Sequence, residues 1–311
     1  MNYLFLGGAG FLGSSIIREL KSSSREANVI IFEPEGANLS RVRGIDAVVE
    51  RGMISDVQRI YGIIEMYHVD TIVHAVSTLI PGSPFESFER ELTDVFMPTI
   101  EIIKYCSMKN IKFVFFSSGG TVYGDGQGAN SFMELDDRLK PKSYYGYSKI
   151  MVEEFILLEH RVAGLRYLIL RPSNPYGPGQ NLKGNQGLIA VAFNKILSGE
   201  PLTIWGDGEA VRDYIYIDDF ARIVSRLLLS GVTDEILNVG SGQGYSINEV
   251  INIIQDVSRG HLKVEYSLKR SVDVSSVVLS MQHTSQFVDC RVRPLREGIA
   301  LFYNNVFADG K

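Results

Sequence analysis

The sequence has little cysteine and no long apolar run. Its 311 residues include two cysteines, Cys106 and Cys290, which are too few and too far apart for a disulfide framework or a zinc site. No apolar stretch reaches the roughly 18 residues that a membrane span needs. The first residues lack a basic segment and are interrupted by glycines, so we expect no signal peptide. These features favour a reducing compartment, and we expect a cytoplasmic location.

Positive charge is also scarce. The chain has 31 Lys and Arg against 36 Asp and Glu, a formal net charge of −5. No overall basic field exists to attract nucleic acid or anionic lipid, so we expect neither as a partner. The five histidines show no metal-ligand spacing, and we expect no metal. A phosphate-bearing ligand would have to be held by a local arrangement of residues.

Short apolar runs alternate with longer amphipathic ones through the first half of the chain. The pattern predicts strands near 3–7, 28–33, 69–76, 112–118 and 166–172. It predicts helices near 11–23, 53–67, 88–109 and 145–163. Strands that alternate with helices are typical of an α/β fold, here a doubly wound parallel sheet covered on both faces.

The regular alternation of predicted strands and helices ends after residue 173. Gly, Asn and Pro are frequent in 174–187, which predicts a loop. We expect a larger domain at 1–173 with a return segment near 214–240, and a smaller, interleaved α/β lobe for the substrate at 174–213 and 241–311. Pro98 is expected to start or kink the helix that contains it.

The stretch GGAGFLG places Gly7, Gly10 and Gly13 three residues apart, between a predicted strand and a predicted helix. Glycine allows a pyrophosphate to approach main-chain N–H groups at the positive end of the helix. Glu33 ends the next strand, where a carboxylate can bind ribose hydroxyls and would repel a 2′-phosphate. The pattern predicts NAD rather than NADP. The alternative is a glycine-rich turn in an unrelated α/β protein.

Tyr145 and Lys149 are one helical turn apart, on one face of a predicted helix. We expect the Lys149 ammonium to lower the pKa of Tyr145, which would make the phenol a usable base. Alternatively, Tyr145 only packs and Lys149 is a solvated surface charge. Hydroxyls of Ser117, Ser118 and Thr121 follow another predicted strand, where ligands of parallel sheets bind, although such residues also close turns.

Taken together, these motifs resemble the extended short-chain dehydrogenase/reductase family, and within it the UDP-glucose 4-epimerase-like enzymes. The matching segments are G-x-x-G-x-x-G at 7–13, SS-x-x-TVYG at 117–124, Y-x-x-x-K at 145–149, RPSNPYGPGQ at 171–180 and WGDGEAVRDYIYIDD at 205–219. The resemblance covers nearly the whole chain. It implies a Rossmann-type fold, NAD as cofactor, a UDP-sugar substrate and a homodimer.

The resemblance also implies roles for individual residues. Catalysis would fall to Tyr145, Lys149, Ser118 and Thr121. The residues implied to bind NAD are Gly7, Gly10, Phe11, Leu12, Gly13, Glu33, Ala75, Ser117, Tyr145 and Lys149. The residues implied to bind the nucleotide sugar are Ser118, Tyr145, Asn174, Gln186, Arg212, Arg270, Asp273 and Val277.

Departures from the family pattern reduce the number of reactions that we expect this chain to catalyse. Gly119 stands where a Ser or Thr usually follows the two serines, so the hydroxyl role would pass to Ser118 or Thr121. Thr121 is followed by Val122 and Tyr123 rather than by the Asp-Glu pair of the 4,6-dehydratases, which argues against dehydration.

We therefore expect C4 epimerisation of a UDP-hexose or UDP-N-acetylhexosamine through a 4-keto intermediate. The N-acetyl group is suggested by Val277, which replaces a bulkier tyrosine of the family, although Val277 could instead only fill a core. A 4-keto reductase and a catalytically silent NAD-binding regulator are the alternatives.

Overall fold

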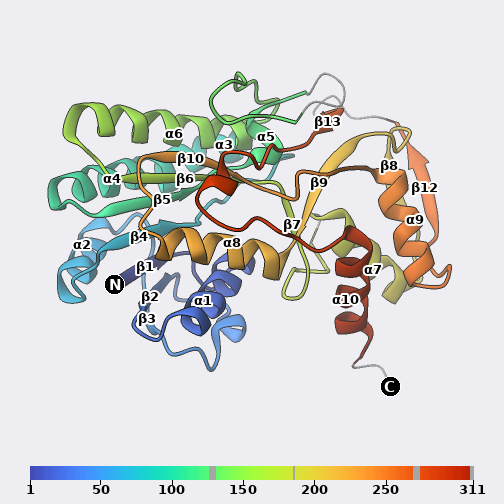
Figure 1. Cartoon of the computed structure of the whole chain (residues 1–311), viewed down its shortest axis with the longest axis horizontal. Coiled ribbons are helices and arrows are strands. Elements are labelled where there is room, and N and C mark those ends of the chain that lie inside the picture. Colours follow the sequence, from blue (N-terminus) through green and yellow to red (C-terminus); the bar gives the residue numbers. More distant parts are fainter. Residues whose placement is uncertain (126–130, 185, 269–273, 309–311) are drawn as a thin grey trace.

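A parallel sheet of seven strands forms the centre of the computed structural model, which describes residues 1–125, 131–184, 186–268 and 274–308 (Figure 1). Its strands lie side by side in the order β10-β6-β5-β4-β1-β2-β3. They are β1 (Asn2–Leu6), β2 (Asn28–Glu33), β3 (Val48–Arg51), β4 (Thr71–His74), β5 (Lys112–Phe116), β6 (Tyr167–Pro172) and β10 (Glu235–Val239). The order reverses between β1 and β4, which makes the sheet doubly wound and confirms the predicted fold class.

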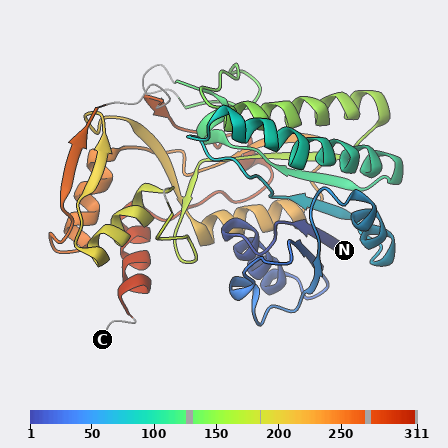
Figure 2. The same ribbon diagram turned by 180° about the vertical axis from the view of Figure 1, so that it is seen from behind.

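Both faces of this sheet are buried. Its central strands are largely apolar, and successive side chains of a strand point to opposite faces. In β1, Tyr3 and Phe5 point into one core cluster and Leu4 and Leu6 into another. The first cluster is covered by α1 (Phe11–Ser23) and α8 (Ile217–Leu229), and the second by α2 (Val57–Met66), α4 (Met97–Lys109) and α6 (Tyr144–Ala163). Figure 2 shows α4 and α6 side by side on the outside of the molecule. None of the helices described here has the length and hydropathy of a membrane span.

The helix predicted over 88–109 consists of three pieces. They are α3 (Phe85–Glu91), a π-helical segment η2 (Leu92–Phe96) and α4. Pro98, which is expected to start or kink the helix, lies in the first turn of α4, directly after η2, where it starts a helical piece. A π-helical turn shifts the register of the side chains that follow it, and such turns are frequent at functional sites.

The second group of strands lies to the right of the large sheet in Figure 1. β9 (Val211–Tyr216) is its central strand and pairs with β7 (Asn174–Tyr176), β11 (Gly244–Ser246) and β13 (Ser276–Val277). A separate ladder joins β8 (Leu202–Trp205) to β12 (Val264–Ser267). The helices in this group are α7 (Leu188–Ser198), α9 (Ile247–Val257) and α10 (Leu295–Phe307). Further short helices elsewhere in the chain are η1 (Ser40–Val42), α5 (Gly119–Val122) and η3 (Thr284–Gln286).

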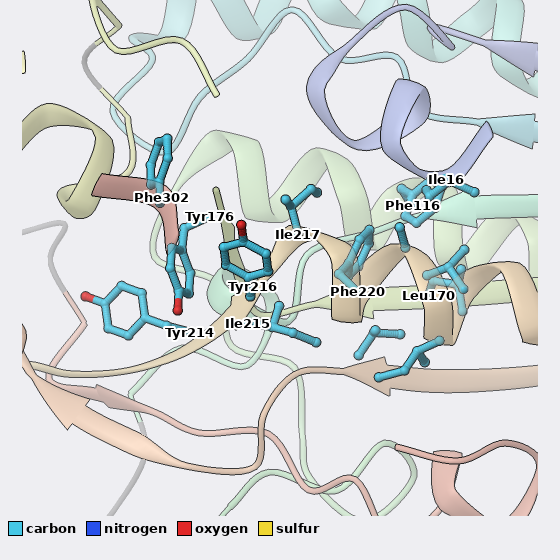
Figure 3. Close-up of a cluster of buried hydrophobic side chains, with 14 of the residues drawn as sticks. Ile16, Phe116, Leu170, Tyr176, Tyr214, Ile215, Tyr216, Ile217, Phe220 and Phe302 are labelled. Carbon is cyan, nitrogen blue, oxygen red and sulfur yellow. The ribbon is translucent and has the colours of Figure 1, made fainter. Parts of the chain in front are cut away.

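One buried cluster joins the two groups of strands. Figure 3 shows it extending from Phe116 and Phe220, next to the large sheet, to Tyr176, Tyr216 and Phe302. β9 leads directly into α8, and β10 then pairs with β6 at the edge of the large sheet. The chain therefore crosses between the two groups more than once. The predicted domain boundaries themselves stay a prediction.

Candidate functional site

The glycine-rich turn after β1 is shaped for close approach by a ligand. Gly7 has φ +82°, a conformation that L side chains rarely adopt. A Cβ on Gly13 would lie 2.8 Å from Gly8 Cα and 2.9 Å from the Gly7 carbonyl oxygen. Gly10 stands at the N-cap of α1 and has no side chain to cap it, which leaves the first N–H groups of the helix for an anion.

Glu33 lies beside this turn. It is 7% exposed, and its Oε1 accepts a hydrogen bond of 2.6 Å from the Ala9 N–H. Burial raises the pKa of Glu33, while the Ala9 N–H and the Arg51 guanidinium act in the opposite direction. A tight glycine turn at the uncapped start of a helix, next to a fixed carboxylate, fits the pyrophosphate and ribose of NAD. The contact of Glu33 with a ribose stays a prediction.

Several predicted site residues follow the carboxyl ends of neighbouring strands. Ala75 follows β4, Ser117 and Ser118 follow β5, and Asn174 follows β6 after one residue. The Ser117 hydroxyl is buried, with no hydrogen-bond partner among the described residues. The Ser118 side chain lies near the Tyr145 phenol and lowers its pKa. Thr121 in α5 donates only a long bond, 3.5 Å, to the Ser118 carbonyl oxygen.

Tyr145 and Lys149 lie in the first two turns of α6. The helix starts there because the Ser143 side chain caps it, accepting a bond of 3.1 Å from the Gly146 N–H. Lys149 is 6% exposed, and its Nζ lies 5.6 Å from the centre of the Tyr145 ring and 5.0 Å from that of Phe115. Lys149 is therefore a buried charge and not a solvated one.

The predicted lowering of the Tyr145 pKa by Lys149 is wrong for this structure. Burial raises the pKa of Tyr145, and the Glu91 carboxylate raises it too, while the nearby Ser118 side chain opposes both. Burial instead lowers the pKa of Lys149 to about 8, against the attraction of Glu91 and Glu153. The reason is geometric, because the Lys149 ammonium faces the tyrosine ring and both groups are withdrawn from water.

The sequence reasoning missed two buried polar residues near this pair. Glu91 at the end of α3 is 4% exposed, and His74 at the end of β4 is 1% exposed. Both line a small cavity together with Lys149. His74 Nε2 lies 2.9 Å from Thr99 Oγ1, and burial lowers the pKa of His74 to about 3. Glu91 lies in the charged stretch FERELTD, which looks like an ordinary surface segment, so the sequence offered no signal for its burial.

Three of the residues predicted to bind the nucleotide sugar lie in the second group of strands: Asn174 in β7, Arg212 in β9 and Val277 in β13. Asn174 Nδ2 donates a bond of 2.8 Å to the Asp213 carbonyl oxygen. The Arg212 guanidinium donates to the carbonyl oxygens of Val211 and Val274, at 2.8 and 2.6 Å. Gln186 is exposed before α7. Arg270 and Asp273 lie outside the described residues, and the predicted contacts of all these residues with substrate stay predictions.

Val277 and Gly119 both lie against a small apolar cluster that contains Val122, Tyr123 and Leu279. Val277 is 1% exposed there, which is the position of a core residue. A Cβ on Gly119 would lie 2.6 Å from Leu279 Cδ1 and 2.9 Å from the Arg171 carbonyl oxygen. The packing of Leu279 thus explains why no hydroxyl side chain stands at residue 119.

Comparison with known proteins places this arrangement in a family. Residues 3–240 match the family described as "NAD dependent epimerase/dehydratase family". A putative UDP-glucose 4-epimerase of Methanocaldococcus jannaschii is 30% identical over 304 residues, covering 97% of each chain. The dTDP-4-dehydro-6-deoxyglucose reductase of Escherichia coli is also 30% identical, over 263 residues, covering 81% of this chain and 80% of the relative.

Solved structures agree. The UDP-glucose 4-epimerase of Thermotoga maritima, solved with UDP-glucose, superposes with a TM-score of 0.90 at 26% identity over 100% of this chain and 99% of the other. That of Thermus thermophilus, solved with NAD, has a TM-score of 0.86 at 26% identity and covers 98% and 99%. The predicted resemblance, the fold and the cofactor are confirmed. This chain belongs to the NAD-dependent epimerase/dehydratase family of nucleotide-sugar enzymes.

Proposed function

We propose that the protein is an NAD-dependent epimerase that inverts C4 of a UDP-hexose or UDP-N-acetylhexosamine through a 4-keto intermediate. The observation that carries the proposal is the side-by-side placement of Tyr145 and Lys149 with Ser118 at the carboxyl edge of the sheet. The glycine turn after β1 opens at the same edge, where doubly wound sheets bind their ligands. NAD, when bound, accepts a hydride from C4 and returns it.

The protein supplies positioning and proton transfer. In its ionised form, which the positive charge of NAD would favour against the effect of burial, Tyr145 Oη takes the proton of the sugar 4-hydroxyl and later returns it to the 4-oxygen. The Ser118 side chain acts on the Tyr145 phenol and lowers its pKa, which supports Ser118 over Thr121 as the auxiliary hydroxyl that shares this proton. Lys149 holds the nicotinamide ribose, and Glu33 selects NAD because a carboxylate repels a 2′-phosphate.

The nucleotide sugar is held, in this proposal, by Asn174, Gln186, Arg212, Arg270 and Asp273. Arginine forks suit diphosphate oxygens. Val277 is buried in the small apolar cluster, so its contribution is the absence of a larger tyrosine that would extend beyond that cluster, and this absence favours acceptance of an N-acetyl group. Comparing kcat/KM for acetylated and plain UDP-hexoses tests this point, and a strong preference for the plain sugar would overturn it.

Tyr145→Phe tests the reaction. Removal of a positioned proton-transfer group costs roughly 10²–10⁴-fold in rate, so we expect kcat for C4 inversion to fall by that factor. Tyr147→Phe is the matched control, because Tyr147 lies on the same helix with an exposed side chain. Undiminished C4 inversion in Tyr145→Phe would contradict the proposal.

A 4-keto reductase is the second candidate, favoured by the 30% identity to the Escherichia coli reductase. An epimerase recycles its NAD, whereas a reductase consumes external NADH or NADPH. Mass spectrometry of the purified protein, together with an assay without added cofactor, separates the two. An epimerase is supported if the purified protein retains NAD and turns over substrate without any added cofactor. A reductase is supported if turnover depends strictly on added NADH or NADPH.

The proposal includes a homodimer formed through α4 and α6. These helices lie side by side and expose Met108, Leu158 and Val162. Two such pairs can form a four-helix bundle about a twofold axis. Sedimentation equilibrium of the wild-type protein and of Val162→Asp tests this: we expect a dimer that the substitution weakens, and a monomeric wild-type protein would contradict it.

A further inference from the structure

A buried carboxylate holds the segment that follows β4. Glu91 is 4% exposed, and one carboxylate oxygen, Oε1, accepts a bond of 3.1 Å from the Ser77 hydroxyl. The other, Oε2, accepts a bond of 2.9 Å from the Thr78 N–H and another from the Thr78 hydroxyl. These donors are neutral, so they orient the carboxylate and fix the loop without neutralising its charge.

The same carboxylate faces Lys149 across a small cavity. Glu91 from α3, His74 from β4 and Lys149 from α6 line this cavity together. His74 contributes no charge at neutral pH, because burial holds its pKa at about 3. Two other ionisable groups of α6 act here, Tyr145 and Glu153.

Glu153 is committed to another partner. Its two carboxylate oxygens accept bonds of 3.1 and 2.6 Å from the Arg171 guanidinium of β6, which neutralises it. Glu91, in contrast, accepts hydrogen bonds only from the neutral groups described above, so its negative charge is available to Lys149. It opposes the effect of burial on the pKa of Lys149.

We propose that Glu91 is a positioning residue for the reaction, and that its charge keeps the buried Lys149 in the ammonium form while tying the loop after β4 to the same site. The inference rests on the proposed function for the role of Lys149 in holding the ribose. It concerns a residue that the family motifs of this chain do not include.

Loss of the charge acts on both members of the pair. Without Glu91, about half of the Lys149 side chains would be neutral amines at pH 7, because the midpoint would fall from about 8 to about 7. The negative field of Glu91, which raises the pKa of Tyr145, disappears as well. Turnover alone is thus a poor readout, and the titration of Lys149 is the direct one.

The experiment is an NMR titration of the full-length protein without NAD or substrate, labelled with 13C at lysine Cε. Lys149→Arg identifies the Lys149 resonance. In the wild-type protein we expect a midpoint of about 8. In Glu91→Gln we expect it to fall by about one pH unit, because a nearby opposite charge changes a midpoint by at least this much.

Two controls separate charge from structure. Asp94→Asn removes one negative charge from the exposed side of η2, and we expect no change in the Lys149 midpoint. Thr78→Val removes a hydrogen bond to Glu91 but keeps its charge, and we again expect no change. Should Glu91→Gln not fold, Glu91→Asp withdraws the charge by one methylene, and a smaller fall in the midpoint is expected.

An unchanged midpoint in a folded Glu91→Gln or Glu91→Asp protein overturns the inference. An equal fall in Thr78→Val also overturns it, because the loop rather than the charge would then control Lys149. The titration needs no turnover, so it stands apart from the proposed function. Failure of the wild-type protein to invert C4 would sink the proposed function and leave the Glu91–Lys149 result intact.

Discussion

Lys149 shows how burial and charge compete at one side chain. Its pKa is about 8 rather than the ordinary 10.5, because withdrawal from water outweighs the attraction of Glu91 and Glu153. The spacing of Tyr145 and Lys149 predicted that they meet, since residues one turn apart share a helix face. It did not predict the direction of either pKa shift, because α3, β4 and β5 create the burial and lie far from α6 in the sequence.

Lys149→Met is expected to stabilise the protein at pH 7 by about 1–3 kcal/mol, because it removes a buried ammonium and keeps the volume. The folded pKa is lowered, so the cost of Lys149 is fully present below pH 8. It disappears as pH rises towards 10.5, where the unfolded chain still binds a proton that the folded chain has lost.

Urea unfolding of the wild-type and Lys149→Met proteins at several pH values measures this difference. The difference in the free energy of unfolding between the two proteins should be largest at pH 7 and should disappear as the pH approaches 10. Lys104→Met, at an exposed position of α4, should show no such difference. A difference for Lys149→Met that stays constant with pH would show that the ammonium is not the cause.

At the scale of elements, the position of α6 depends on a buried ion pair. Arg171 of β6 and Glu153 of α6 are 2% and 1% exposed, and the guanidinium also donates to the Tyr123 hydroxyl at 3.0 Å and the Glu134 carbonyl oxygen at 3.1 Å. This network fixes the helix that carries Tyr145 to the strand beside it.

Glu153→Gln is expected to destabilise the protein by about 3–5 kcal/mol, because it leaves the Arg171 charge buried without its counter-ion. The free energy of unfolding from urea denaturation at pH 7 measures the effect. Glu65→Gln is the matched control, since Glu65 forms an exposed pair with Lys109 at 2.7 Å. Equal stability of the two variants would contradict the role of the buried network.

At the scale of the molecule, the large sheet and the second group of strands share one hydrophobic cluster (Figure 3). Phe116 of β5 and Phe302 of α10 belong to the same buried cluster. Elements that share a core lose their packing together, so the two groups are expected to unfold in one cooperative step.

Two probes test this expectation. Trp205, the single tryptophan, lies in β8 and reports on the second group of strands, while far-UV circular dichroism reports on the whole chain. The two denaturation curves should coincide. Phe302→Ala should shift both by about 3–5 kcal/mol, and Leu301→Ala, on the exposed side of α10, by much less. Separate transitions would show two independent folding units.

The sequence by itself determined the layout of the doubly wound sheet, the glycine turn and the Tyr145–Lys149 pair, because each depends on a local period or spacing. The strands β3 and β10, which form the two edges of the large sheet, were not predicted, because charged and polar residues interrupt their apolar runs. Only the tertiary structure decided that Leu279 fills the space beside Gly119, that Val277 lies in a core, and that Glu91 faces Lys149. These features depend on contacts between segments far apart in the chain, which no local pattern encodes.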